Sequence, residues 1–135
     1  MKKLFALCLA LFTLAACGGG DDNTPENAAT AYVQAMYQGD VDRAVKLVYL
    51  SEKDKQQAGI NDLVRGKLAE SAQANKARAE QKGGLKAIYH EETIYYDEQD
   101  KNRANVRLKV ELKKAEPEMA DIRVIKTDDG WKVKL

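Results

Sequence analysis

The hydrophobic pattern of the chain changes its period at Gly83-Gly84, and this change fixes the fold class. Before the two glycines, apolar residues recur at the three-to-four-residue spacing of helices buried on one side. After them, apolar and polar residues alternate, as in strands of an antiparallel sheet with one solvated face. Helices followed by strands predict an α+β domain, with three N-terminal helices packed on a curved four-stranded antiparallel sheet.

Capping signals place the helices. Thr24 precedes a proline and a glutamate, which is typical of an N-cap followed by a first helical turn. Gly39 is suited to end this helix, and Asp40 can cap a second one. A third helix is expected over residues 60–81, and a cap at Ser51 opens a stretch too polar to assign. The third helix begins with an apolar stripe: Ile60, Leu63, Val64 and Leu68.

Three of the four expected strands alternate regularly between apolar and polar residues. The last two are joined at Asp129-Gly130, a tight hairpin signal. The residues expected to face the core are Val106, Leu108, Val110 and Leu112 in the second strand, Ala120, Ile122 and Val124 in the third, and Trp131, Val133 and Leu135 in the fourth.

The first strand is less regular. Ile88, Ile94 and Tyr96 could share its core face, but His90-Glu91-Glu92 interrupts the alternation. One extra residue in a strand produces such an interruption, so we expect a β-bulge at this point.

The N-terminus has the three parts of a secretory signal peptide: basic Lys2 and Lys3, an uncharged apolar run over residues 4–14, and small residues before Cys17. The run is too short to cross a bilayer of ~30 Å as a helix. Leu14-Ala15-Ala16-Cys17 matches the bacterial lipobox, so the chain resembles a lipoprotein precursor. The resemblance implies cleavage before Cys17 and lipidation of its thiol. The alternative is an ordinary signal peptide cut elsewhere, with Cys17 left as a free thiol.

Cleavage before Cys17 divides the chain into a signal peptide (1–16), a lipidated cysteine with a Gly-rich tether (17–24) and one domain (25–135). Cys8 would leave with the signal peptide, so the mature chain could form no internal disulfide. Gly18 follows the cysteine in place of the aspartate that retains many such proteins in the inner membrane. By that resemblance the outer membrane is favoured, on its periplasmic or surface side.

The charge balance excludes one class of partner. Without Lys2 and Lys3 the mature chain has 20 basic and 21 acidic residues, so it has no basic excess to neutralise a phosphate backbone. We therefore expect no nucleic-acid binding. His90 is the single histidine, so a histidine-rich metal cluster is excluded, and no metal or other cofactor is expected. The acidic runs at 97–100 and 128–129 are interpreted as turns.

The region over residues 32–44 resembles the opening of the NTF2-like (cystatin-like) superfamily, in particular bacterial lipoproteins of the DUF4878 type. The shared features are an aromatic residue, a small residue three positions later, Gly39-Asp40 and Ala44. The closing run from Asp129 to Val133 matches the last hairpin of such domains. The resemblance implies a cone-shaped half-barrel with a cavity between sheet and helices. It implies no particular reaction, because the superfamily holds enzymes, binding domains and assembly modules.

Few residues are candidates for a site. In a regular strand His90 and Glu92 would face the same side and could form an acid/base pair, as in some NTF2-like isomerases and dehydratases. The alternative places both on a solvated or bulged strand. Tyr95 and Tyr96 are candidates for a pocket or a partner surface, because tyrosine combines an apolar ring with a hydrogen-bonding tip. The alternative for both is packing in the core or on the sheet.

Together these patterns predict a lipid-anchored envelope protein that is not an enzyme. It would act as a binding or interaction module, with a small apolar ligand in the cone or an envelope protein on the sheet. The alternative function is a cone-pocket enzyme of the isomerase or hydrolase type that uses His90 and Glu92. An inhibitor of host lysozyme or another hydrolase is a third possibility, which only the location favours.

Overall fold

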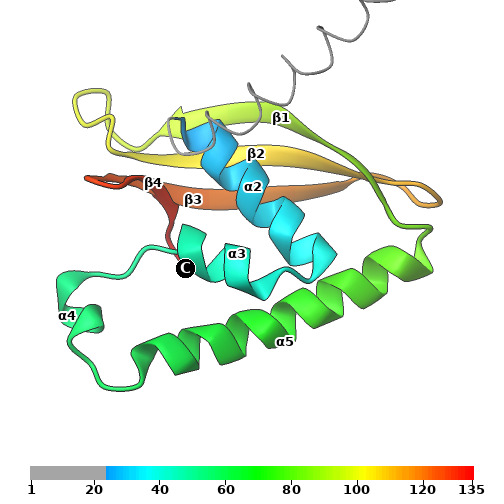
Figure 1. Ribbon diagram of the computed structural model, residues 1–135. Helices are drawn as coiled ribbons and strands as arrows, with labels where there is room; N and C mark the ends of the chain where they lie inside the picture. The colour runs from blue at the N-terminus through cyan, green and yellow to red at the C-terminus, as the bar shows by residue number, and fades with distance from the viewer. Residues whose placement is uncertain (1–23) are drawn as a thin grey trace, which may run out of the picture.

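The computed structural model describes residues 24–135, so the predictions for the signal peptide, Cys17 and the tether lie outside the described residues. Helices precede an antiparallel sheet whose strand order is β1-β2-β3-β4 (Figure 1). The predicted α+β class is confirmed. The elements are α2 (Pro25–Gln38), α3 (Val41–Leu47), α4 (Glu52–Lys55), α5 (Ile60–Gln81), β1 (Leu85–Tyr95), β2 (Arg103–Leu112), β3 (Glu118–Thr127) and β4 (Gly130–Val133).

The predicted caps form. The Thr24 side chain accepts a hydrogen bond from the Asn27 N–H at 3.1 Å, and Asp40 caps α3 through the Arg43 N–H at 3.2 Å. Between them Gly39 has a φ of 73°, which an L-residue adopts only with strain. Ser51 caps the short helix α4, accepting from the Asp54 N–H at 3.1 Å, in the stretch that the sequence left unassigned.

Helix α2 lies across one face of the sheet, which we call the inner face (Figure 1). Small side chains let the helix backbone approach the strands closely, and Ala28, Ala29 and Ala35 are completely buried. The long helix α5 packs against α2 and α3, on the side of these helices away from β1 (Figure 1). The helices therefore form a layer over the inner face, and the outer face of the sheet carries no described helix.

The start of α5 differs from the prediction. Of the expected apolar stripe only Leu68 is buried, whereas Leu63 is half exposed. The helix forms over the predicted range, but its first turns extend past the edge of the core. Tertiary contacts farther along, at Leu68, Ala72 and Ala79, attach it to the domain.

Strands β2, β3 and β4 follow the predicted alternation. Leu108, Val106, Val110 and Val124 are fully buried on the inner face, and Trp131 is nearly so. Pairing Leu108 with Ala120, and Val124 with both Ala104 and Val133, keeps apolar side chains on the same face across the sheet. Leu135 is an exception, because β4 ends at Val133 and Leu135 is exposed.

The predicted bulge in β1 is present and reverses the face of the residues after it. The register shifts between His90, which pairs with Leu108, and Glu92, which pairs with Arg107. Tyr95 then faces the core opposite Ala104, while Ile94 pairs with Asn105 on the outer face. Sequence reasoning predicted the bulge but continued the alternation through it, so the assignment of Ile94 and Tyr96 to the core face is wrong.

A group of four side chains connects the end of α5 to the sheet. Glu118 of β3 accepts hydrogen bonds from the Tyr37 hydroxyl at 2.8 Å, Arg78 at 3.1 Å and Lys82 at 2.9 Å. Arg78 also donates to the Tyr37 oxygen and lies over its ring. The Lys82 hydrogen bond, then that of Tyr37, lowers the pKa of the Glu118 carboxyl, since both favour its ionised form.

Replacing Glu118 by glutamine removes the negative charge that pairs with Arg78 and Lys82, so the free energy of unfolding at pH 7 should decrease. Because water screens these partly exposed cations, we expect a loss of only about 1 kcal/mol. A carboxyl with a lowered folded pKa stabilises the fold above its ordinary value and loses that contribution as the pH falls through the folded pKa. The difference between wild type and Glu118→Gln should therefore disappear in acid. Urea unfolding of both proteins at pH 7 and in acid measures this difference in the free energy of unfolding. Glu116→Gln, two residues away and exposed, is the matched control, and an equal loss in both variants would contradict the prediction.

Candidate binding site

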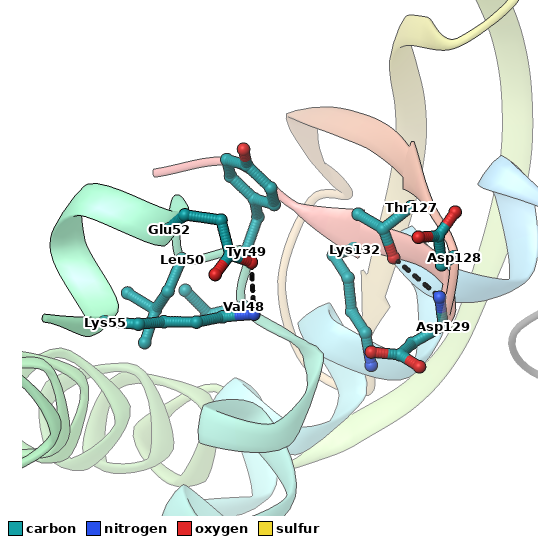
Figure 2. A pocket seen from close by; sticks show the side chains of 9 residues that line it. All are labelled: Val48, Tyr49, Leu50, Glu52, Lys55, Thr127, Asp128, Asp129 and Lys132. Carbon is teal, nitrogen blue, oxygen red and sulfur yellow. Dashed lines mark hydrogen bonds and ion pairs between the residues drawn. The ribbon is translucent and has the colours of Figure 1, made fainter.

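One hollow among the described residues lies between two segments that are far apart in sequence. The stretch after α3 pairs with the end of the sheet: Val48 forms a parallel bridge with Val133, and the Tyr49 N–H donates to the Val133 carbonyl at 2.7 Å. This pairing holds the segment from Val48 to Lys55 opposite the β3–β4 hairpin. The space between them has a volume of about 280 Å³ (Figure 2).

Each side of the hollow carries both signs of charge. On one side Lys55 of α4 pairs with Glu52 at 3.3 Å. On the other side Lys132 donates to the Lys46 carbonyl at 3.1 Å, beside Asp129 (Figure 2). Val48, Tyr49 and Leu50 supply the apolar part of the lining.

The hairpin side of the hollow is fixed by its own turn. The Thr127 hydroxyl donates to the Gly130 carbonyl at 2.7 Å and accepts from the Asp129 N–H at 3.1 Å. At the other acidic run, Asp97 and Asp100 accept from backbone N–H groups two residues on. Both acidic runs are thus turns, as predicted. Within residues 24–135 no group of three or more His, Cys, Asp or Glu side chains is arranged to hold a metal ion.

A second hollow, of about 330 Å³, lies between α2 and the start of β1. Thr30, Gln34 and Gln38 line it from the helix, and residues 85–88 line it from the strand. Two glutamines and a threonine supply hydrogen-bonding groups, and Lys86, whose ammonium lies 3.9 Å from a carboxylate oxygen of Glu111, supplies a charged group.

His90 takes part in a hydrogen-bond chain with Thr93 and Glu26, and Glu92 is not a member of it. Its Nε2 lies 2.7 Å from the Thr93 hydroxyl, which donates at 2.7 Å to a carboxylate oxygen of Glu26 in α2. Because the threonine proton is committed to Glu26, Thr93 accepts from His90, so Nε2 carries a proton. Glu92 lies on the other face of the sheet, so the acid/base pair of His90 and Glu92 does not form, in agreement with the interpretation of a bulged strand.

The two candidate tyrosines have different environments. Tyr95 packs edge-on against Trp131, with ring centroids 6.5 Å apart, and Lys101 lies over its ring. This contact matches the alternative of core packing for Tyr95. Tyr96 is on the outer face, where its N–H donates to the Arg103 carbonyl and its side chain is half exposed. Only Tyr96 therefore retains the surface that a partner could contact.

Sequence reasoning did not identify the hollow between Val48–Lys55 and the hairpin. Asp129-Gly130 was interpreted only as a turn, and Lys55 lies in the stretch that could not be assigned. The available signal was the cap at Ser51, which predicts an ordered turn carrying Glu52 and Lys55.

Comparison with solved structures gives the same architecture. A crystal structure from Campylobacter jejuni, described as a candidate NTF2-like transpeptidase, superposes with a TM-score of 0.73 and 23% sequence identity, covering 84% of this chain and 99% of the other. At this identity the likeness establishes the fold and carries no activity across. No curated protein sequence matches the chain significantly.

The family comparison covers nearly the whole chain. The model of a domain of unknown function, DUF4878, matches residues 15–134. The match begins before the first described helix and ends within the last residues of the chain, so it includes every element of the sheet and both hollows. The chain therefore belongs to the DUF4878 family, and its domain has an NTF2-like fold.

Proposed function

We propose that this protein is a lipid-anchored component of the bacterial envelope whose NTF2-like domain binds a polar, charged ligand or peptide segment without catalysing a reaction. The hollow between Val48–Lys55 and the β3–β4 hairpin is the observation that carries the proposal. A carboxylate and an ammonium on each side of one hollow can pair with a ligand that itself carries both charges.

The packing of α2 favours a polar ligand over an apolar one. Ala28, Ala29 and Ala35 are buried directly against the rest of the core, and Leu108 and Val106 beneath the helix are fully buried. The side chains of the inner face are thus engaged with the helix rather than with an open apolar cavity. An apolar ligand in the cone would have to displace these contacts.

The geometry around His90 favours binding over catalysis. A general base needs a partner that orients it and a sheltered place for the reacting group. The bulge separates His90 from Glu92, and the Glu26–Thr93–His90 chain ends on an exposed imidazole. These contacts have a structural use, because they hold the first turn of α2 against β1.

Support for the envelope location comes from the sequence. The signal peptide and the Leu-Ala-Ala-Cys tetrapeptide favour export and lipidation of Cys17, and Gly18 favours the outer membrane. Within residues 24–135 the helices are all too short or too polar to span a bilayer.

NMR chemical-shift titration tests the binding site. Trialanine with free termini carries one charge of each sign, and we expect it to shift the amide signals of Tyr49, Lys55 and Asp129. Lys55→Ala should weaken the binding severalfold, since one ionic partner is lost. Lys53→Ala, on the same short helix but outside the lining, should leave it unchanged.

Sodium dodecanoate is the comparison probe for an apolar ligand. If dodecanoate shifts the signals of Val106 and Leu108 while trialanine shifts none, the ligand site is the cone and the proposal is wrong. If Lys53→Ala and Lys55→Ala weaken the binding of trialanine equally, the loss reflects the net charge of the protein. The proposed binding site beside Lys55 would then also be wrong.

A further inference from the structure

Large apolar side chains lie exposed on the outer face of β1. Ile94 and Tyr96 are 53% and 51% exposed, and Tyr89 follows on the same face at 45%. Their pairing opposite Asn105, Arg103 and Lys109 places all three on the side of the sheet away from α2. We call Tyr89, Ile94 and Tyr96 the β1 patch.

The β1 patch lies close to the point where the tether enters the domain. Thr93, next to Ile94 in the strand, donates a hydrogen bond of 2.7 Å to Glu26 in the first turn of α2. Figure 1 shows this first turn against β1, while α5 lies on the opposite side of the molecule. Glu26 therefore fixes the first turn of α2 against the inner side of β1, and the patch lies on the outer side of the same strand.

The length of the tether limits how far this end of the domain can lie from the membrane. The inference rests on the proposed lipidation of Cys17. Six residues, 18–23, separate that cysteine from Thr24, and fully extended they reach at most ~20 Å. Among the exposed apolar groups, the β1 patch is thus within reach of the lipid surface, whereas α5, the helix that contains Leu63, lies on the far side of the molecule (Figure 1).

We propose that the β1 patch contacts the bilayer that carries the lipid anchor, with Ile94 and Tyr96 entering the interfacial layer. Tyrosine is favoured at this depth, because its ring is apolar and its hydroxyl remains hydrated. The contact would fix the orientation of the domain and leave the opposite side, with α5, facing the aqueous space.

The charges around the patch indicate an apolar contact rather than an ionic one. Arg107 pairs with Asp121 at 2.9 Å, Lys109 lies 3.9 Å from Glu91, and Arg103 lies 3.8 Å from Asp100. With these cations paired to carboxylates of the protein, the surface has little excess charge to offer an anionic lipid. The contact should therefore persist at high salt.

Fluorescence quenching by brominated lipids tests the proposal on the full lipidated protein. Tyr96→Trp adds a reporter in the β1 patch, and the one natural tryptophan, Trp131, is buried and supplies the baseline. Leu63→Trp, equally exposed on α5, is the matched control. The vesicles contain phosphatidylethanolamine and phosphatidylglycerol with bromines on the acyl chains, and flotation first measures whether each protein is attached.

On the brominated vesicles the tryptophan of Tyr96→Trp should lose most of its fluorescence, both at low and at high salt. The tryptophan of Leu63→Trp should keep its fluorescence. Failure to float would contradict the lipid anchor itself. Flotation with an unquenched reporter at position 96 would overturn the β1 patch alone. Flotation with a dimer that Ile94→Ser dissociates would overturn it in favour of a second copy of the chain on this face.

Discussion

Replacing Cys17 by serine is expected to abolish acylation and release the protein from the membrane fraction. The Leu-Ala-Ala-Cys tetrapeptide places the thiol where a lipoprotein precursor is modified, and serine offers no thiol for the lipid. One acyl chain gives only marginal membrane binding and two or more give stable anchoring. Loss of the lipid should therefore move nearly all of the protein into the soluble fraction.

Metabolic labelling with a fatty-acid analogue, followed by fractionation, measures this change. Cys8→Ser is the matched control, since Cys8 lies in the apolar run that cleavage removes. It should leave both labelling and membrane attachment intact. Labelling that survives in Cys17→Ser would contradict the prediction. A wild-type protein without label but with a reactive thiol would favour the alternative of an ordinary signal peptide.

Strands β2, β3 and β4 could be predicted well because their side chains alternate regularly between apolar and polar. Where alternation is strict, as from Val106 to Leu112, every second side chain must be buried and the face follows directly. The caps at Thr24 and Asp40 were equally local, since each satisfies an N–H three residues away. These elements could therefore be predicted from the neighbouring residues alone.

The first strand shows where local reasoning fails. A bulge changes the face of every later residue, so the assignment of Tyr95 and Tyr96 depends on which residue is the extra one. His90-Glu91-Glu92 marks the place of the bulge, but the sequence contains no signal for its register. The register comes from pairing with β2, which is a tertiary property.

The candidate site depends even more on long-range contacts. Lys55 and Asp129 line the same hollow, although more than seventy residues separate them. They meet because Val48 pairs with Val133, and neither residue has a sequence pattern that predicts this bridge. The same holds for the Glu26–Thr93–His90 chain, whose members come from α2 and β1.

The stability of the domain must come from packing, because residues 24–135 contain no cysteine. Leu108 is the largest of the fully buried side chains, at the centre of the inner face between His90 of β1 and Ala120 of β3. Its removal leaves a cavity that the rigid sheet and α2 cannot close completely. The loss in stability is then the sum of two costs: the transfer free energy of the removed atoms and the free energy of the cavity that they leave.

Leu108→Ala is accordingly expected to lower the free energy of unfolding by about 2–5 kcal/mol, measured by urea denaturation of the domain. Leu63→Ala removes the same atoms from a half-exposed position on α5 and should cost no more than about 0.5 kcal/mol. Both variants remove the same atoms, so the difference between their free energies of unfolding reports the effect of burial alone. A similar cost in both would mean that the inner face of β2 is not the packed core, and the assignment of α2 to that face would fail with it.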